Sequence, residues 1–188
     1  EMAVYFVFIR FLWSKERRFF FEGSLPLLGQ MYVAERKALY EIIIERKPRH
    51  CFEIGTYTGG GSTYFLARAF EKIKHGKLVT MEIDPYYFHK AKNYFLHKIP
   101  RVGAHTTFIL GGEAKEFDGV IKEYDGVDCV FLDGAEDGGQ TLTQYYYFLP
   151  YFHTGTILNI HDWNTEKTRM LKPVLTGDKK WKIIKEIK

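Results

Sequence analysis

The amino-acid sequence predicts an α/β domain, in which a doubly wound, mostly parallel β-sheet carries helices on both faces. Two observations support this fold class. Short apolar segments alternate with segments of helical periodicity along most of the chain, and strict β–α alternation is typical of a parallel sheet covered by helices. The first strand also leads into a glycine-rich turn and a helix, which is the arrangement of a nucleotide-type ligand site.

The chain has 188 residues, of which 46% are hydrophobic and 27% charged. This length and balance are typical of one globular domain with a substantial core. Much of the net charge of +4 comes from lysines near the C-terminus, so it gives no strong indication of nucleic-acid binding. The two cysteines, Cys51 and Cys129, fall inside expected strands. They are too few for a disulfide scaffold, and we expect buried free thiols and a cytoplasmic location.

Residues 1–28 are expected to form an apolar, helical N-terminal segment, and residues 29–188 the ligand-binding domain. Met2–Trp13 is apolar except for Arg10, but it is shorter than the about 20 residues that cross a bilayer. Its positive charges follow the apolar run, which disfavours a signal peptide. Three alternatives stay open: a helix packed on the domain or a second subunit, a helix at a membrane surface, or the trimmed end of a longer chain. The first predicts a homodimer.

Six apolar segments rich in β-branched and aromatic residues are predicted as strands. They are Cys51–Ile54, Leu78–Ile83, Thr106–Leu110, Val127–Leu132, Thr156–Ile160 and Trp181–Ile187. An acidic residue or a glycine lies at or next to the end of each of the first five. Because ligands of such sheets lie beyond the carboxyl ends of the strands, we expect the functional residues at these positions.

Six further segments are predicted as helices. Met31–Arg46 repeats an apolar face and ends before Pro48, and Pro85 suits the first turn of another helix. The predicted helices are Met31–Arg46, Ser62–Phe70, Pro85–Leu96, Glu113–Lys122, Leu142–Tyr151 and Thr165–Leu171.

The glycine-rich turn between Glu53 and Ser62 discriminates between two nucleotide ligands. A dinucleotide fold needs glycine at the first, third and sixth positions of the turn. Gly55 and Gly60 fit the first and sixth, but Tyr57 stands at the third. Glu53 would repel a phosphate and suits the cationic end of a ligand. S-adenosylmethionine carries an ammonium and a sulfonium and no phosphate, so the turn favours it over a nicotinamide cofactor.

Polar residues at the ends of the second and third strands could hold the rest of an adenosyl ligand. The carboxylate of Glu82 can accept both ribose hydroxyls, and Asp84 is either its rival or the cap of the helix that begins at Pro85. After the third strand, the small residues Gly111 and Gly112 leave room for a flat adenine, and Glu113 could accept from its amino group. The alternative is that these residues only begin a helix.

Asp133, His161 and Asp162 follow the fourth and fifth strands. Two carboxylates and an imidazole suit a divalent metal ion, which would lower the pKa of a substrate hydroxyl. The alternative is a structural histidine.

The chain has no G-x-S-x-G motif, which disfavours a serine hydrolase, and no Pro-Pro-Tyr after the fourth strand, which disfavours methylation of nucleic-acid bases. Trp163 is the aromatic residue expected to contact substrate.

Four segments in order carry a family resemblance: Glu53-Ile-Gly-Thr-Tyr-Thr-Gly59, Met81-Glu-Ile-Asp-Pro85, Phe131-Leu-Asp-Gly134 and His161-Asp162. Together they resemble the class I S-adenosylmethionine-dependent methyltransferases, which have a Rossmann-like fold. Within that class the chain is similar to the small-molecule O-methyltransferases, of the catechol and caffeoyl-CoA types and of the macrocin O-methyltransferase and cephalosporin-hydroxylase-like group.

The resemblance implies O-methylation of a small hydroxylated acceptor, with S-adenosylmethionine as the donor and a magnesium-type ion at Asp133, His161 and Asp162. Asp133 and His161 are the candidate catalytic residues. The candidate cofactor-binding residues, from the motifs and the resemblance together, are Glu53, Gly55, Thr56, Tyr57, Gly59, Ser62, Glu82, Asp84, Gly112, Glu113, Ala114 and Asp133.

The sequence also departs from this family. The turn Gly59-Gly-Gly-Ser62 has one residue more than the relatives. Glu136 stands where catechol-type enzymes carry a lysine base, and the histidine of macrocin-type relatives is missing as well. His161 replaces a carboxylate of several metal-dependent relatives. Two rival functions therefore stay open: a diverged, hydroxylase-like enzyme on the same fold, and a non-catalytic protein that binds an adenosyl ligand.

Overall fold

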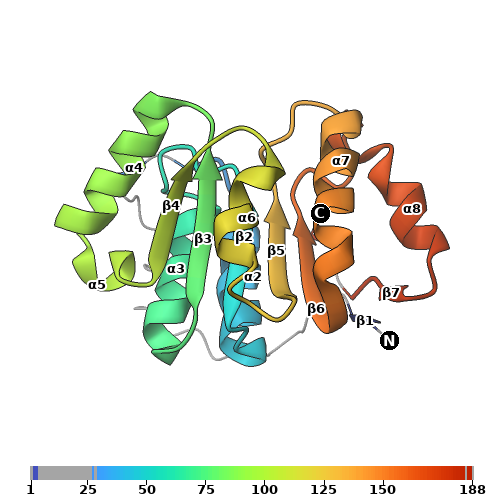
Figure 1. Cartoon of the computed structure of the whole chain (residues 1–188), viewed down its shortest axis with the longest axis horizontal. Helices are drawn as coiled ribbons and strands as arrows, with labels where there is room; N and C mark the ends of the chain where they lie inside the picture. The colour runs from blue at the N-terminus through green and yellow to red at the C-terminus, as the bar shows by residue number, and fades with distance from the viewer. Residues whose placement is uncertain (1, 4–26, 28, 185, 188) are drawn as a thin grey trace.

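The computed structural model describes residues 2–3, 27, 29–184 and 186–187 (Figure 1). Its main sheet has five parallel strands in the order β4-β3-β2-β5-β6. The strand order reverses between β2 and β5, and in open α/β sheets a ligand lies at the carboxyl ends of the strands near such a reversal. The predicted doubly wound α/β fold is confirmed.

The five strands of this sheet lie within one residue of the predicted bounds, except that β6 begins at Phe152 instead of Thr156. Ile54 is paired with both Met81 and Leu132, so the carboxyl ends of the three central strands are level. The strands are β2 (His50–Ile54), β3 (Lys77–Glu82), β4 (Thr106–Leu110), β5 (Val127–Leu132) and β6 (Phe152–Ile160).

One face of the sheet is covered by the helices that precede β4. Ile43, Phe70 and Phe95 of these helices are buried against strand residues such as Cys51 and Leu78, and each fully buried side chain of this size stabilises the fold by about 1.5–3 kcal/mol. Cys51 and Cys129 are both buried and free, as predicted. The helices are α2 (Val33–Arg46), α3 (Ser62–Ile73), α4 (Pro85–His97) and α5 (Pro100–Gly103).

The opposite face is covered by later and shorter elements, as Figure 1 shows. Phe117 and Phe148 pack there against Phe52, with ring centroids 5.3 Å and 5.9 Å from it. The elements are η1 (Ala114–Phe117), α6 (Asp118–Ile121), α7 (Gly138–Phe148), η2 (Leu149–Tyr151), η3 (Glu166–Thr168) and α8 (Leu171–Gly177). The core therefore has two layers, one on each side of the sheet.

Three predicted helices differ from the observed ones. Glu113–Lys122 is divided into η1 and α6. The helix predicted at Leu142 begins at Gly138, because Asp137 accepts hydrogen bonds from the first turn, and its regular part ends before Pro150. The helix predicted over Thr165–Leu171 is a single turn, η3, and α8 follows it.

The last strand, predicted over Trp181–Ile187, is wrong in length. Only Trp181–Lys182 forms a strand, β7, and it pairs in parallel with β1 (Met2–Ala3) in a separate two-stranded sheet. Met2 and Ala3 are thus extended where the sequence predicts helix. Apart from these two residues and Leu27, the predicted N-terminal segment lies outside the described residues. Within the described part of the chain, no helix has the length and hydrophobicity needed to cross a membrane.

Candidate functional site

A pocket of about 470 Å³ opens at the carboxyl ends of β2, β3 and β5. It is walled by the glycine-rich turn, the strand ends and the loops before α2 and after β6. Among the residues predicted for the site, those that line it are Gly55, Thr56, Tyr57, Ser62, Glu82, Gly112, Asp133, His161 and Asp162. The predicted residues Glu53, Gly59, Asp84, Glu113 and Ala114 are not among its walls.

The glycine-rich turn is held against β3 and β5. Gly55 has a φ of +105°, in the region that favours glycine, and its amide donates to the Met81 carbonyl at 3.0 Å. A Cβ atom on Gly55 would lie 3.0 Å from the amide nitrogen of Gly134. Glycine at this position therefore allows both the turn and its close approach to the end of β5.

The Glu82 carboxylate is buried and fixed by two backbone amides. Its Oε2 accepts from the Tyr57 amide at 2.6 Å and its Oε1 from the Asp84 amide at 3.0 Å. Each oxygen keeps a further lone pair, so the carboxylate is oriented to accept a pair of ligand hydroxyls. Asp84 instead caps α4, since its Oδ1 accepts from the Tyr86 amide at 2.7 Å. The geometry therefore fits the capping alternative for Asp84.

Glu53 is fully buried behind the pocket, on the face of β2 that carries α3. Its Oε2 accepts from the Thr63 hydroxyl at 2.7 Å, and its Oε1 has no hydrogen-bond partner. Burial raises the pKa of this carboxyl to about 7, although nearby hydroxyls, including that of Ser62, oppose the shift. Its contact with a ligand stays a prediction, while its contact with Thr63 fixes the start of α3.

Three other residues predicted to bind the cofactor lie away from the pocket wall and contact other parts of the protein. Gly59 has a φ of +81°, and a Cβ there would lie 3.0 Å from the Phe95 ring. Ala114 is buried in the core. Glu113 is exposed and forms an ion pair with Lys115 at 2.9 Å. Beyond β3 and β4, the pocket is instead lined by Ile83, Gly111 and Gly112.

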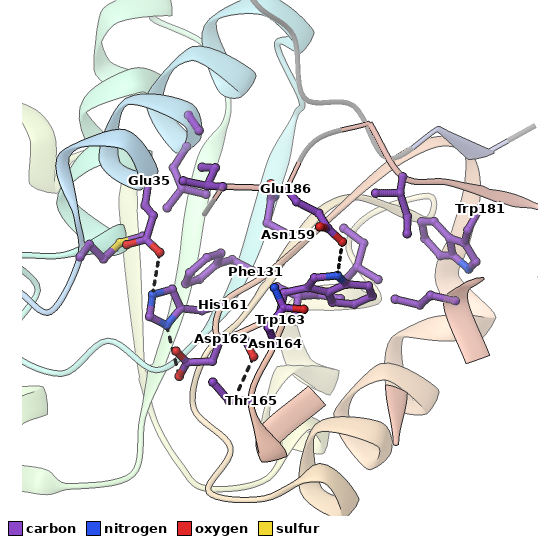
Figure 2. A pocket seen from close by; sticks show the side chains of 18 residues that line it. Glu35, Phe131, Asn159, His161, Asp162, Trp163, Asn164, Thr165, Trp181 and Glu186 are labelled. Carbon is purple, nitrogen blue, oxygen red and sulfur yellow. Dashed lines mark hydrogen bonds and ion pairs between the residues drawn. The ribbon is translucent and has the colours of Figure 1, made fainter. Parts of the chain in front are cut away.

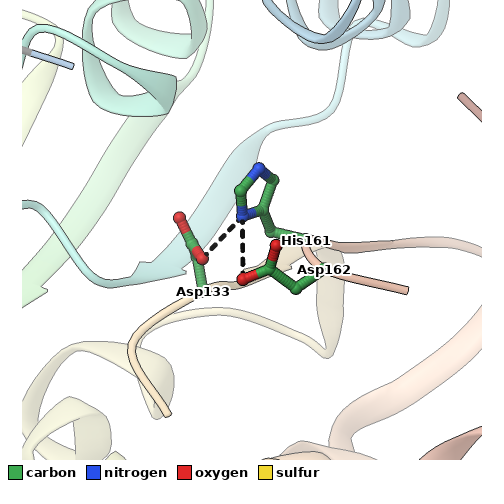
Figure 3. Close-up of side chains that lie close together, drawn as sticks. All are labelled: Asp133, His161 and Asp162. Carbon is green, nitrogen blue, oxygen red and sulfur yellow. Dashed lines mark hydrogen bonds and ion pairs between the residues drawn. The ribbon is translucent and has the colours of Figure 1, made fainter. Parts of the chain in front are cut away.

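Asp133, His161 and Asp162 come together where the sheet ends (Figure 3). The distance from His161 Nδ1 to Asp133 Oδ1 is 2.9 Å, and to Asp162 Oδ2 it is 3.5 Å. One ligand atom from each residue lies within 4.8 Å of the others. The hydrogen bond with Asp133 raises the pKa of His161 to about 9, against the effect of burial, so this position favours positive charge.

Glu35 is a residue of this site that sequence reasoning missed. It lies in the first turn of α2, and its Oε1 is 3.3 Å from His161 Nε2. Its Oε2 accepts from the Tyr32 amide at 2.8 Å, which fixes the side chain. Lys167 was also missed, and its Nζ lies 3.4 Å from Asp162 Oδ2. The sequence shows Glu35 only as an acidic residue near a helix start, with no indication of a partner 126 positions away.

A second pocket, of about 250 Å³, adjoins the first (Figure 2). The two share Met31, His161 and Asp162 as lining residues. Apolar and aromatic side chains form most of its wall, and among them Trp163 donates from Nε1 to Glu186 Oε1 at 2.6 Å. The predicted substrate contact of Trp163 thus fits its place in this second pocket.

The extra glycine of the turn has a packing explanation. Gly29 crosses the turn so closely that a Cβ on it would lie 2.3 Å from the Gly61 amide nitrogen and 2.4 Å from the Gly60 carbonyl carbon. The backbone after Gly29, with Gln30 and Met31, then lines the first pocket. Small residues on both sides allow the loop before α2 to form a wall of the site.

Comparison with known proteins places this geometry in a family. Residues 52–163 match the family described as "Methyltransferase domain". The O-methyltransferase of tomaymycin synthesis from Streptomyces achromogenes, in complex with SAM, has 20% sequence identity and a TM-score of 0.61, over 79% of this chain and 70% of that one. The O-methyltransferase from Bacillus cereus, in complex with SAH, has 17% identity and a TM-score of 0.63, over 80% and 72%.

A third similar structure is the SAH-bound methyltransferase of Podospora anserina, with 21% identity and a TM-score of 0.55 over 70% of this chain. The chain spans 53% of that protein's length. No curated protein matches this sequence. At such identities, the likeness to solved structures establishes the fold.

Proposed function

Because the chain belongs to the methyltransferase domain family, we propose that it is an S-adenosylmethionine-dependent O-methyltransferase acting on a small hydroxylated acceptor. The observation that carries this proposal is the pair of adjoining pockets. One has an oriented carboxylate suited to a ribose, the other is mainly apolar, and Asp133, His161 and Asp162 lie at or beside their boundary. A methyl donor bound in the first pocket and an acceptor bound in the second could therefore meet beside these three polar residues.

The first pocket fits an adenosyl donor. Glu82 would accept from the ribose hydroxyls, and the glycines after β4 would leave room for the adenine. The walls near Asp133 are acidic, and Gln144 Oε1 in the same pocket is buried without a hydrogen-bond partner. Unsatisfied acceptors of this kind are suited to the ammonium of a methionine moiety.

Catalysis would rest mainly on positioning the two reactants. When bound, S-adenosylmethionine would supply an electrophilic methyl group for the acceptor oxygen, and the hydroxyl proton would pass to a carboxylate of the site. Trp163 and its apolar neighbours would orient the acceptor and exclude water. Asp133 lines the first pocket and His161 lines both, so the Asp133 carboxylate would accept the hydroxyl proton while His161 would hold that carboxylate in place.

The same residues fit a divalent cation. Asp133, Asp162 and His161 offer two carboxylates and one ring nitrogen within bonding range of a single ion, and such an ion would lower the pKa of an acceptor hydroxyl. A homodimer and a cytoplasmic location stay predictions from the sequence.

The proposal is tested with methyl-labelled S-adenosylmethionine and a panel of small hydroxylated acceptors, with S-adenosylhomocysteine and labelled product measured by mass spectrometry. We expect Asp133→Asn to lower turnover by at least about 100-fold while largely sparing donor binding. The exposed Glu123→Gln, which removes a distant carboxylate, serves as the control. Donor binding without transfer to any acceptor would favour the non-catalytic alternative, and unchanged turnover in Asp133→Asn would refute a catalytic role for Asp133.

A further inference from the structure

Carboxylate groups lie next to both ring nitrogens of His161. Nδ1 faces Asp133 at the end of β5 and Asp162 in the loop after β6, at 2.9 Å and 3.5 Å. Nε2 faces Glu35 of α2 at 3.3 Å. Figure 2 shows the ring between Glu35 on one side and Asp162 on the other. The ring is therefore oriented from two sides by elements that are far apart in the sequence.

This arrangement has the order of groups found around a metal-bound histidine. A histidine that ligates a metal through one ring nitrogen usually donates its other N–H to a carboxylate, which fixes the tautomer and the ring orientation. Here Nδ1 faces the two candidate carboxylate ligands, and Nε2 faces the outer carboxylate of Glu35. Glu35 is itself held by the Tyr32 amide, so its position does not depend on the ring.

We propose that Asp133, Asp162 and His161 Nδ1 form a mixed nitrogen–oxygen site selective for a transition-metal dication such as Mn²⁺ over Mg²⁺, with Glu35 as the positioning residue of His161. This inference rests on the proposed function, because it names the metal that would assist methyl transfer. Mg²⁺ is bound almost entirely through oxygen and keeps several waters, whereas imidazole suits first-row transition metals such as Zn²⁺, Fe²⁺ and Ni²⁺. Mn²⁺ is the first-row ion with the weakest affinity for mixed nitrogen–oxygen sites and is also well suited by carboxylates, so comparing it with Mg²⁺ is the most stringent test of this preference.

The experiment uses the metal-stripped full chain, with Mn²⁺ and Mg²⁺ titrated separately by calorimetry. We expect Mn²⁺ to bind at least about tenfold more tightly than Mg²⁺. Glu35→Gln should weaken Mn²⁺ binding by about 10–100-fold and change Mg²⁺ binding little. Glu45→Gln removes an exposed carboxylate from the same helix and should bind Mn²⁺ like the unmodified protein.

A second variant and a spectroscopic readout separate a positioning role from a folding defect. Pulsed electron paramagnetic resonance of bound Mn²⁺ should show coupling to an imidazole nitrogen in the unmodified protein. In His161→Asp that coupling should vanish and the preference for Mn²⁺ over Mg²⁺ should fall. Circular dichroism of each metal-free variant checks its fold, and Glu35→Asp should restore part of the Mn²⁺ affinity.

Three outcomes would overturn the inference: no Mn²⁺ binding, equal affinity for the two ions, or bound Mn²⁺ without nitrogen coupling. The first would mean that a protonated His161 neutralises the surrounding carboxylates by itself. Calorimetry with S-adenosylmethionine is run on the same samples without metal. Donor binding without Mn²⁺ binding would refute the metal site and leave the proposed function intact, whereas loss of both would refute the two proposals together.

Discussion

Replacing Glu53 by glutamine is expected to stabilise the protein at neutral and alkaline pH. The folded-state pKa of Glu53 is about 7, compared with an ordinary value of 4.5, because burial disfavours the charged carboxylate. The folded protein therefore holds this proton more tightly than the unfolded chain does. Below about pH 4.5 the carboxyl is protonated in both states, and Glu53 does not affect the free energy of unfolding. Between about pH 4.5 and 7 the free energy of unfolding falls as the pH rises, and above about pH 7 it stays at the lower value.

The size of the effect follows from the two pKa values. A difference of about 2.5 units, at 1.36 kcal/mol per unit, corresponds to about 3 kcal/mol of stability lost at about pH 8. Glutamine has nearly the same shape and no charge, so Glu53→Gln avoids this loss. The gain over the unmodified protein should be small near pH 4 and reach about 3 kcal/mol near pH 8.

The assay is urea-induced unfolding of both proteins at several pH values, because the linear dependence on denaturant gives the free energy of unfolding directly. Only the difference between the two proteins is interpreted, since other groups titrate over the same range. Glu123→Gln, at an exposed position, is the matched control and should show a difference that is nearly independent of pH. A difference for Glu53→Gln that is also flat with pH would refute the claim that Glu53 is buried with a raised pKa.

Three further predictions concern the site and its support. Glu82→Ala should weaken binding of S-adenosylmethionine by about 10–100-fold in calorimetry, because hydrogen bonds to a charged group contribute about 1.5–3 kcal/mol; unchanged affinity would contradict the ribose role. Gly55→Ala should lower the free energy of unfolding by about 2 kcal/mol or more, because its φ is +105° and the added methyl would meet the Gly134 backbone; a stability equal to the unmodified protein would refute this strain. Asp128→Asn should destabilise the protein by about 1–3 kcal/mol at pH 7, because it weakens hydrogen bonds to a charged group. Burial would raise the pKa of Asp128, but its hydrogen bonds and its ion pair with the half-exposed Arg49 lower it, so this stabilisation should fade as the pH falls below the ordinary aspartate range. Equal acid sensitivity of the two proteins would show that the ion pair contributes nothing.

The sequence predicts the five main strands and the edge at which their polar ends meet, because burial imposes a simple pattern on parallel strands. Glu82, Asp133 and His161 were found in this way, since each lies at the end of an apolar strand or directly after it. The same reasoning could not decide between two roles for Asp84, because capping a helix and accepting ribose hydroxyls both call for a carboxylate before a helix.

Residues brought to the site by long-range packing could not be predicted. Glu35 contacts His161 only because α2 packs beside the sheet. The sequence around Glu35 gives no indication of this contact. Gly29 contacts Gly60 and Gly61 for the same kind of reason. Glu113 stands beside small residues in the sequence, but its side chain is exposed and paired with Lys115, so its contact with a ligand stays a prediction.

The measurement that tests the central claim most directly is calorimetric titration of the full chain with S-adenosylmethionine and S-adenosylhomocysteine, with NAD as the control. The oriented Glu82 carboxylate and the pocket beside it predict micromolar binding of both adenosyl ligands and none of NAD. Absence of adenosyl binding, or equal binding of NAD, would contradict the methyltransferase account and leave only the fold.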